Sequence, residues 1–500
     1  MAISPPSLPP DQAWTPFDPA RWDAGCARHL LRRTGFSAPQ NKVDRALQQG
    51  LPATLQDSLG TLRPMSQSDA LADYLARMPA MWRDRVAAVQ AGTYKMGDKF
   101  DYFFGDVRRD AYRRSMQHWL AFARAPENSV QENFVMFLCG VLVVAINKIN
   151  SPEWLFGYQS FIRASLRHPF PEICKALPLT LAMANYLDLF ANYRNGPNEN
   201  YARELMELFT LGEGHYTESD VKEAARAFTG FYNDDGYSRF DPARWDSGDK
   251  TIFGRTGPWG ANDVADLIFT QPAARTHLPA RFLSYYLSDD PLPAPYLETL
   301  GALWQQQGWR LDALAGLVFS SKLFYEPSFR GNLVKSPVRF YLGMCQDLGV
   351  DIYPFPPDQK LLMLAAAGQD PFNPPTVRGW LGGRTWLNPS TWLARAQLVD
   401  DAFTPRADPP SDPEEAAWLN TVRARGPVKF FVQPDHFQDL ASLSPDAAAN
   451  RLVNRFLPGQ SAPEYRASVA DYLKNTAGPR NELLIDSAKS LLLSPLYQLC

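Results

Sequence analysis

Ionisable side chains at helical spacing gather in one segment, residues 198–212, which reads NENYARELMELFTLG. At 100° per residue, five polar side chains share one face of the expected helix and the apolar residues occupy the rest. The five are Glu199, Asn200, Arg203, Glu204 and Glu207. Glu204 and Glu207 are one turn apart, a spacing that presents two carboxylates for acid–base chemistry or as oxygen ligands of a metal.

This polar face allows two interpretations. As a solvent-exposed stripe, it is held by ion pairs of Arg203 with Glu199 and Glu207, each four residues away. As an inward-facing site, its three carboxylates exceed its one arginine, so the surplus negative charge demands a metal, another cation or raised pKa values. The residues alone favour the exposed stripe, and the family resemblance described below moves the preference to the inward site.

Two helices must position these side chains. A Gly-Pro pair ends the preceding element, and Asn198 offers an N-cap for the first helix. The second helix begins at Thr217, whose spacing to Asp220 forms a capping box. We therefore expect a helical hairpin, with His215 on the surface of its connection.

Apolar residues recur at helical spacing through most of the chain, whereas the alternating patterns of β-strands are scarce. The sequence therefore predicts an all-α fold, a large irregular helical domain with long ordered loops and a C-terminal helical extension. The most apolar stretch, Phe134 to Ile146, is too short to span a bilayer. It predicts a helix that is buried on all sides.

Proline-rich segments divide the chain. We expect a proline-rich arm over residues 1–20, a helical core over 21–400, a proline-rich acidic linker over 401–414 and C-terminal helices over 415–500. The last piece is small and its apolar residues need a partner, so we expect it to pack back on the core.

A second candidate site lies in the glycine- and proline-rich segment from Pro374 to Trp392, which predicts an ordered loop. Trp380 and Trp386 offer flat rings on which a ligand could stack. The commoner alternative is that such tryptophans wedge a loop against the core while their N–H groups bind backbone carbonyls.

Composition and charge exclude several classes of protein. The formal net charge of −3 gives no global field that would attract nucleic acid or an anionic membrane. The arginines at 108, 109, 113 and 114 are more typical of a solvated helix face, so we expect no nucleic-acid partner. The five cysteines never form CxxC, and residues 1–14 lack the pattern of a secretory signal. These features predict reduced thiols and a cytoplasmic protein without a membrane span.

Short motifs of several enzyme classes are absent. The chain contains no GxxxxGK[ST] phosphate loop, no GxGxxG turn, no GxSxG elbow and no HExxH helix. ATP, NAD and serine-hydrolase functions are therefore disfavoured. The sequence predicts no cofactor and no metal ligand, although metal, haem and flavin stay open as alternatives.

The helical hairpin also carries a family resemblance. NENYARELMELFTLG followed by YTESDVKEAARAFTGF resembles the signature of the bacterial family called domain of unknown function 1800. Further segments that resemble the family are HLLRRTGF at 29–36, KSPVRF at 335–340, VRGWLGGRTWLN at 377–388 and the closing SLLLSPLYQL. The resemblance covers nearly the whole chain. It implies an all-α fold and no established reaction.

The chain departs from the family pattern at residues with chemistry. The family's buried helix typically carries Trp-His-Asn-His-Phe where this chain has residues 138–142, so Cys139 and Val141 replace two histidines. Trp245, before Asp246, replaces a third. Such imidazoles, together with the glutamates of the polar helix, would form a metal or acid–base site in the wider family. The replacements therefore imply a degenerate metal site, provided that the three positions converge in space.

Cys139 itself has two interpretations. As a thiolate it would be a nucleophile or a ligand of a soft metal. Its apolar neighbours predict instead a raised pKa and a small core residue, which is the interpretation we favour.

Another patch that resembles the family contains His29, Arg32 and Arg33, with His29 and Arg33 one turn apart. Arginine suits bidentate contacts with carboxylates. We expect one of the two arginines to close a charge network with the glutamates of the polar helix.

Two functions are compatible with these features. The first is a divergent, non-catalytic and metal-free accessory or binding protein on a former enzyme frame. Members of the family are often encoded beside the family called domain of unknown function 1501, so the resemblance implies such a protein partner. The second is a metal- or cofactor-dependent enzyme, for example an oxidoreductase, with a rebuilt carboxylate-rich site. Its candidate catalytic residues are Glu204, Glu207, Arg203 and Asp246, and the candidate binding residues are Glu199, Asn200, Arg32, Arg33, His29, Trp380 and Trp386.

Overall fold

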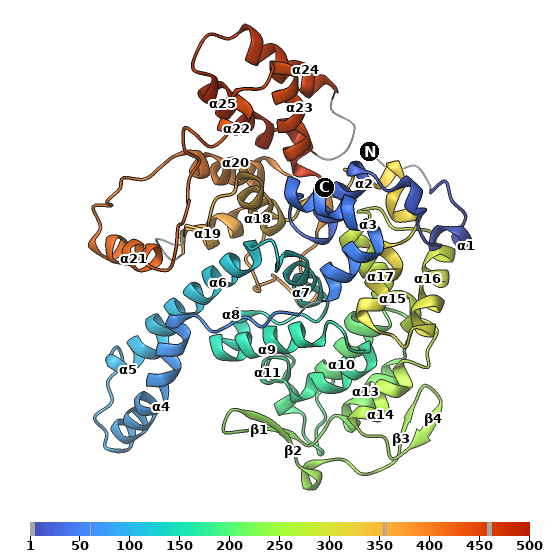
Figure 1. The fold of residues 1–500 in the computed structure, drawn as a ribbon. Helices are drawn as coiled ribbons and strands as arrows, with labels where there is room; N and C mark the ends of the chain where they lie inside the picture. Colours follow the sequence, from blue (N-terminus) through green and yellow to red (C-terminus); the bar gives the residue numbers. More distant parts are fainter. Residues whose placement is uncertain (1–5, 61, 354–355, 357, 458–462) are drawn as a thin grey trace.

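The computed structural model describes residues 6–60, 62–353, 356, 358–457 and 463–500, and helices make up most of it (Figure 1). The first helices are α1 (Pro10–Ala13), α2 (Ala24–Thr34), α3 (Gln40–Gly60), α4 (Asp69–Gln90), α5 (Lys99–Tyr102), α6 (Arg108–Arg124), α7 (Ser129–Val141), α8 (Ile146–Ile149) and α9 (Pro152–Ser165). Next come α10 (Phe170–Ala176), α11 (Leu181–Tyr186), α12 (Asn200–Glu204), α13 (Glu218–Ala227), α14 (Ala261–Ile268), α15 (Ala274–Tyr286), α16 (Ala294–Gln306) and α17 (Leu311–Phe319). The last are α18 (Pro337–Leu348), α19 (Gln359–Ala366), α20 (Pro389–Phe403), α21 (Pro413–Arg423), α22 (Gln438–Ala441), α23 (Pro445–Phe456), α24 (Pro463–Asn475) and α25 (Arg480–Leu492).

Short 3-10 and π turns join these helices. The π turns are η2 (Phe103–Val107) and η5 (Leu205–Thr210). The 3-10 turns are η1 (Pro19–Arg21), η3 (Leu177–Leu179), η4 (Leu189–Ala191), η6 (Pro242–Arg244), η7 (Leu323–Tyr325), η8 (Pro327–Phe329), η9 (Gly383–Trp386) and η10 (Pro495–Gln498). The predicted helical fold is confirmed. Residues 1–5 of the expected N-terminal arm lie outside the described residues.

Two small antiparallel hairpins interrupt the helical pattern, and the sequence did not predict them. Strands β1 (Phe231–Asp234) and β2 (Tyr237–Phe240) pair with each other, as do β3 (Lys250–Ile252) and β4 (Arg255–Gly257). Three or four residues are too few for a period of two to be read from the sequence. Both hairpins lie at the lower edge of the molecule in Figure 1.

Helix α7 lies at the centre of the molecule (Figure 1). Every side chain of α7 except that of Val130 is buried, as its apolar sequence predicted. Its one carboxylate, Glu132, is fully buried and accepts hydrogen bonds from the Arg163 guanidinium at 2.7 and 2.8 Å and from the Trp119 indole at 2.8 Å. These bonds offset the cost of burying the charge and tie α7 to α6 and α9. Within the described ranges, no helix combines the length and the apolar character that crossing a bilayer requires.

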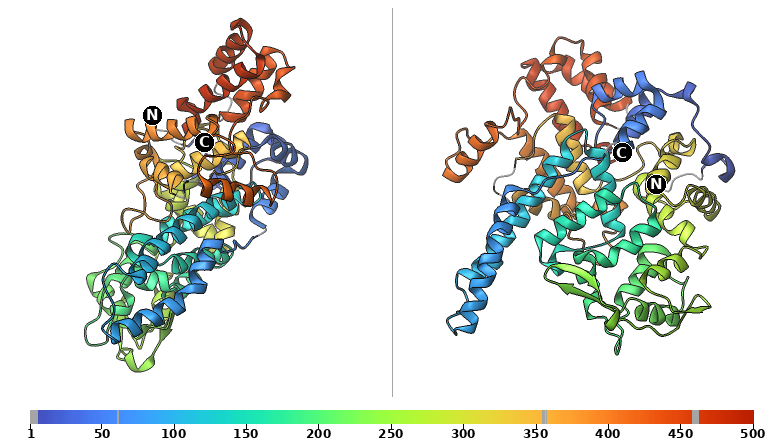
Figure 2. Two further views of the ribbon diagram at one scale, coloured as in Figure 1. Left: turned by 90° about the vertical axis from the view of Figure 1, so that its left-hand side faces the viewer. Right: turned by 60° about the horizontal axis from the view of Figure 1, so that its bottom comes forward.

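Helices α4 and α5 form an arm that projects from the body (Figure 2). The cluster of arginines noted in the sequence lies where α6 joins this arm. Arg109 and Arg114 pair with acids on the same surface, at 2.5 Å from Asp106 and 2.8 Å from Asp110. These are the ion pairs of an ordinary solvated helix face.

Buried arginines bind the C-terminal carbonyl groups of several helices. Arg33 donates to Tyr286 O and Leu287 O at the end of α15, both at 3.1 Å. Arg339 donates to Arg33 O at 2.8 Å and to Arg32 O at 3.3 Å, at the end of α2. The last four carbonyl groups of a helix lack partners within it and carry the negative end of its dipole, so a guanidinium suits them.

Arg32 does the same for α23. Its guanidinium donates to the carbonyl oxygens of residues 454, 455 and 457 at 2.9, 3.0 and 2.8 Å. The prediction that Arg32 or Arg33 joins the glutamates of the polar helix is therefore wrong, because helix ends take both guanidinium groups. His29 is structural as well, since its Nε2 lies 2.9 Å from Phe324 O and burial lowers its pKa well below the usual value.

Lys335 is a buried cation beside this network. It is 3% exposed, and its Nζ lies 3.6 Å from the centre of the Tyr497 ring. The Tyr497 hydroxyl in turn donates to the buried Asp347 carboxylate at 2.9 Å. Burial lowers the pKa of Lys335 to about 7, because the charged form loses its hydration.

We predict that Lys335→Met is more stable than the parent protein at pH 6, by on the order of 3 kcal/mol. Between pH 7 and 10.5 the unfolded lysine binds more protons than the folded one, so the parent gains stability as pH rises and the difference shrinks. Urea unfolding between pH 6 and 9 measures this, with the exposed Lys474→Met as control. A difference that stays constant with pH would contradict the prediction.

Candidate functional site

The polar helix consists of α12 and the π turn η5, which run without a break from Asn200 to Thr210. Asn198 Oδ1 accepts the Asn200 N–H at 2.9 Å, but the N-cap position is Glu199, one residue later than predicted, and its side chain makes no capping bond. At the other end, His277 Nε2 lies 2.8 Å from Leu208 O. The predicted capping box between Thr217 and Asp220 is present at the start of α13.

The first half of the polar face is a surface ion-pair network. Arg203 binds Glu199 at 2.9 Å, as predicted, and Glu218 of α13 at 2.7 Å. The Arg203 and Glu199 side chains are 30% and 34% exposed, so solvent screens the pair. The amide of Asn200 donates to Asp188 at 3.2 Å.

Glu207 does not pair with Arg203. It accepts the Tyr216 hydroxyl at 2.5 Å and the Arg378 guanidinium at 2.9 Å, and Arg378 also binds Glu213. The predicted ion pair between Arg203 and Glu207 is therefore wrong. Tyr216 and Arg378 bind Glu207 instead, and the π turn alters the helical spacing on which the prediction depended.

Glu204 is the exception on this face. Its Oε2 is buried and has no hydrogen-bond partner among the described residues. Burial, followed by repulsion from Glu207, raises the pKa of Glu204. In the part of the chain that the structure describes, no three His, Cys, Asp or Glu side chains group as ligands of a metal.

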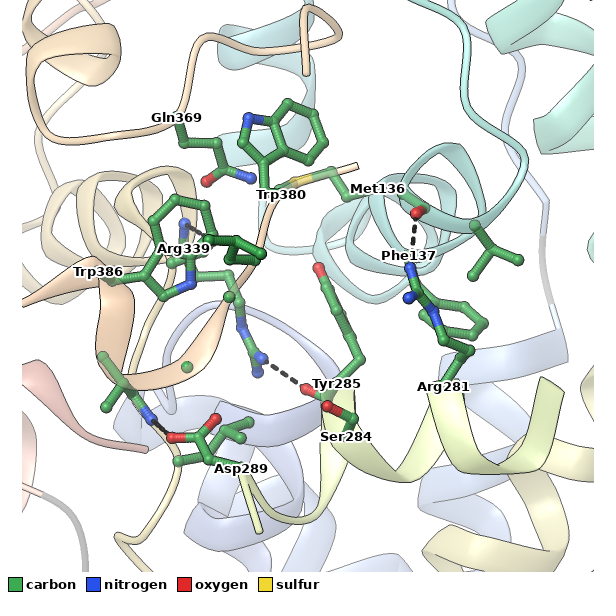
Figure 3. A pocket seen from close by; sticks show the side chains of 18 residues that line it. Met136, Phe137, Arg281, Ser284, Tyr285, Asp289, Arg339, Gln369, Trp380 and Trp386 are labelled. Atoms are coloured by element: carbon green, nitrogen blue, oxygen red, sulfur yellow. Dashed lines mark hydrogen bonds between the residues drawn. The ribbon is translucent and has the colours of Figure 1, made fainter. Parts of the chain in front are cut away.

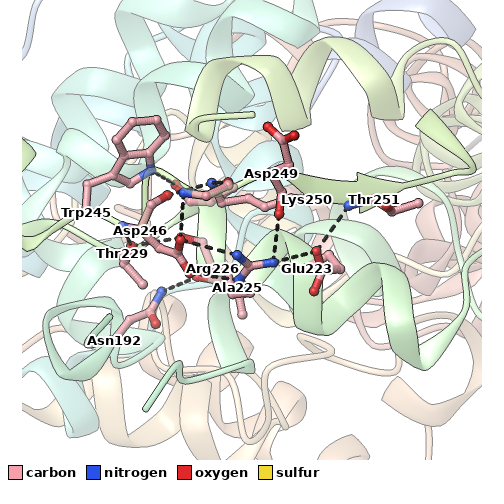
Figure 4. A network of polar contacts seen from close by, with 12 residues as sticks. Asn192, Glu223, Ala225, Arg226, Thr229, Trp245, Asp246, Asp249, Lys250 and Thr251 are labelled. Atoms are coloured by element: carbon pink, nitrogen blue, oxygen red, sulfur yellow. Dashed lines mark hydrogen bonds and ion pairs between the residues drawn. The ribbon is translucent and has the colours of Figure 1, made fainter. Parts of the chain in front are cut away.

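Asp246 belongs to a different network (Figure 4). Arg226 of α13 binds it at 2.7 Å and lowers its pKa, and Lys250 donates to its backbone carbonyl at 2.6 Å. Trp245 donates its indole N–H to Ala227 O at 3.2 Å. These contacts hold the segment between the hairpins against α13 and give Asp246 a structural role.

The three positions at which the family resemblance implied histidines do not converge. Cys139 is 6% exposed on α7 and borders a small apolar cavity with Trp119 and Val338. Burial raises the pKa of its thiol, as expected for a core residue. Val141 lines the next cavity, whereas Trp245 donates its indole N–H to Ala227 O at the end of α13. The expectation of one shared site for these positions is therefore wrong.

That next cavity lies where the segment from Pro374 to Trp392, which we call the Trp380 loop, packs against the end of α7 (Figure 3). We call the cavity the tryptophan pocket, and its volume is about 150 Å³. Its apolar lining includes Met136, Phe137, Val141, Trp380 and Trp386. Its polar lining is Arg281, Ser284, Tyr285, Asp289, Ser336, Arg339 and Gln369. The structure thus brings together two of the predicted binding residues, Trp380 and Trp386. The polar helix does not contribute to the described lining, although Arg378 of the same loop binds Glu207.

Two glycines allow the Trp380 loop to lie close to α7 and to Asp289. Gly379 has φ of 82°, and a Cβ there would lie 2.9 Å from Gly140 O of α7. Gly383 has φ of 56°, and a Cβ there would lie 3.0 Å from Asp289 Oδ1. Both positions therefore favour glycine, because side chains disfavour positive φ and a Cβ would crowd the Gly140 carbonyl or the Asp289 carboxylate.

The wall of the pocket is held by hydrogen bonds to backbone. Arg281 donates to Gly140 O at 3.1 Å, and Arg339 to Tyr285 O at 3.2 Å. The Tyr285 hydroxyl donates to Asn133 Oδ1 at 2.8 Å, and burial raises its pKa to about 12. Burial also raises the pKa of Asp289, whose only bond to the described chain is from Val334 N–H at 3.4 Å.

The sequence did not point to Arg281, Ser284, Tyr285, Asp289 or Gln369. No short motif contains them, and the three that lie on α15, Arg281, Ser284 and Tyr285, have no distinctive spacing. Two other lining residues, Ser336 and Arg339, could have been identified from the sequence, because they belong to the KSPVRF segment that resembles the family.

Comparison with known proteins gives one match. A family model described as a protein of unknown function (DUF1800) matches residues 29–499. No curated protein and no solved structure matches the chain.

We predict that Glu204→Gln raises the free energy of unfolding at pH 7 by about 0.5 kcal/mol. The folded carboxyl holds its proton more tightly than the unfolded one, so the parent loses stability as pH rises above 4.5 and the variant does not. Urea unfolding at pH 4 and 7 measures the difference.

Glu218→Gln is the matched control on the same surface. Its hydrogen bonds to Arg203 lower the pKa of Glu218, so this variant should lose stability at pH 7. Equal effects of the two substitutions at pH 7 would show that Glu204 is not destabilised by burial.

Proposed function

The chain belongs to the DUF1800 family of proteins of unknown function, and on this premise we propose that it is a metal-free accessory protein that binds a small ligand in the tryptophan pocket. The observation that carries the proposal is the convergence of aromatic rings and polar groups from α7, α15, α18 and the Trp380 loop around one cavity. Concave sites with an apolar lining and a few polar groups are where proteins bind small molecules.

The chemistry of the lining favours binding over catalysis. Among the residues that the structure describes, no histidine, cysteine or lysine lines the pocket. Arg339 donates to carbonyl groups, and the raised pKa keeps the Tyr285 hydroxyl protonated at neutral pH. Arg281 likewise donates to a backbone carbonyl, and Asp289 is the one carboxylate among the described lining residues. A single carboxylate is a poor start for acid–base catalysis.

A second candidate function is an enzyme that uses the polar helix. The observation in its favour is Glu204, whose buried oxygen and raised pKa suit a general acid. Against it, Arg203, Glu207 and Asp246 have structural partners among the described residues, and Arg226 holds Asp246 in a separate network.

The cellular setting and the partner belong to the same proposal. All five cysteines are unpaired and buried, which suits a reducing compartment such as the cytoplasm. The exposed Trp82, Met96 and Tyr102 on the α4–α5 arm give an apolar surface for a protein partner, for which a member of the family domain of unknown function 1501 is our candidate.

A thermal-shift panel tests the binding function. Its probes are amino acids, choline, glycine betaine, dicarboxylates and methyl pyranosides, each at millimolar concentration. We expect one class to raise the Tm of the parent, Trp380→Ala to abolish the shift and Trp392→Phe, outside the pocket, to retain it. The ligand should be recovered unchanged after prolonged incubation.

Two outcomes would overturn the proposal. If no probe raises the Tm, or if the shift survives Trp380→Ala, the tryptophan pocket is not the ligand site. If the ligand is chemically converted and Glu204→Gln stops the conversion, the enzyme reading is correct.

A further inference from the structure

The two tryptophans give the pocket a flat aromatic side. Trp386 is 7% exposed and Trp380 is half-buried, and Figure 3 shows both across the cavity from Tyr285 and Phe137. An aromatic face favours a ligand that presents an apolar face of similar size. Cavities of about 150 Å³ hold one six-membered ring, and the pocket has this volume.

The polar side chains of the tryptophan pocket provide three kinds of hydrogen-bonding group: a guanidinium donor, a carboxylate acceptor, and hydroxyl or amide groups that already accept one bond. Arg281 only donates hydrogen bonds, and the Asp289 carboxylate only accepts them. Ser336 Oγ accepts the Arg339 N–H at 3.3 Å, which leaves its own hydroxyl proton to donate. Gln369 Oε1 accepts the Val338 N–H at 3.0 Å, which leaves its amide NH₂. A hydroxyl both donates and accepts, so a ring with several hydroxyls satisfies all three kinds at once.

Charge in the pocket wall disfavours ionic ligands. Arg281 and Arg339 outnumber Asp289 and repel a cation. Both guanidinium groups already donate to backbone carbonyls, and the Asp289 carboxylate repels an anion on its own side of the pocket. Burial, which raises the pKa of Asp289, removes water from its carboxylate, and its bond from Val334 N–H is long at 3.4 Å, so hydroxyl donors would stabilise the charged form. A neutral polyhydroxylated ring meets these conditions.

We propose that the tryptophan pocket binds one pyranose ring of a neutral sugar, with an apolar C–H face against Trp380 and hydroxyls toward Asp289, Ser336 and Gln369. This inference rests on the proposed binding function. The rim of the pocket is open, since Leu381 is 91% exposed and Ser284 is also exposed. Both a free monosaccharide and the terminal ring of a glycan fit such a site, because the rest of a chain would leave through the open rim.

Titration calorimetry with the full chain tests the inference. The probes are methyl glucopyranoside, methyl galactopyranoside and methyl mannopyranoside, with cellotetraose and maltotetraose as the glycan arm. We expect at least one methyl pyranoside to bind. Binding of a tetrasaccharide as well identifies a glycan end, and binding of the methyl pyranosides alone identifies a free sugar. Both results support a pyranose site.

Variants separate ring stacking from a general effect on the fold. Trp380→Ala should weaken sugar binding about tenfold, because it removes the aromatic face, and Trp380→Phe should retain most of the affinity. Ser284→Ala, at an exposed position, should weaken it a few-fold. Trp392→Phe should have no effect. Tm values of all four variants show whether each is folded.

The contradicting results distinguish the inference from the function on which it rests. Trp380-dependent binding of an amino acid, choline, betaine or a dicarboxylate, without any sugar, would overturn the pyranose site and leave the binding function intact. Sugar binding that is equally strong in Trp380→Ala and Trp380→Phe, or no binding by any probe, would overturn both.

Discussion

A buried guanidinium must find acceptors, and in this protein the ends of helices supply them. Arg33 binds the end of α15, Arg32 binds the end of α23, and Arg339 binds the end of α2. Arg395 adds a bond to Lys335 O at 2.8 Å beside α18. The first three contacts offset the burial of a charge and the unpaired carbonyls of a helix terminus, and hydrogen bonds to charged groups contribute about 1.5–3 kcal/mol each. Helices that are distant in the sequence are therefore joined at their ends as well as along their sides.

The tryptophan pocket depends on this constraint. Arg339 links the end of α2 to Tyr285, and the Tyr285 hydroxyl reaches Asn133 of α7, so three helices meet at defined positions. The Trp380 loop closes the space between these helices, because Gly379 lets the loop backbone pack against Gly140 of α7. One set of interactions thus fixes the fold and leaves a cavity of mixed aromatic and polar lining.

Local features were predictable from the sequence because their causes are local. The capping box of Thr217, the buried helix around Cys139 and the pair of Arg203 with Glu199 depend on residues within a few positions of one another. The acceptors of Arg32 and Arg33 are backbone carbonyls more than 250 positions away, and carbonyls have no sequence signature. Trp380 and Trp386 were recognisable as binding candidates because they lie close together in one segment of the sequence. The polar residues opposite them on α15 were not, because they come near the tryptophans only in the folded chain.

The measurement that tests this account most directly is the ¹H–¹⁵N spectrum of the tryptophan indole N–H groups during titration with a methyl pyranoside. Tryptophan-to-phenylalanine variants assign the signals. The account predicts that the Trp380 and Trp386 signals shift in a saturable way while the Trp392 and Trp245 signals stay in place. Shifts confined to Trp245, or no saturable shift at Trp380, would contradict it.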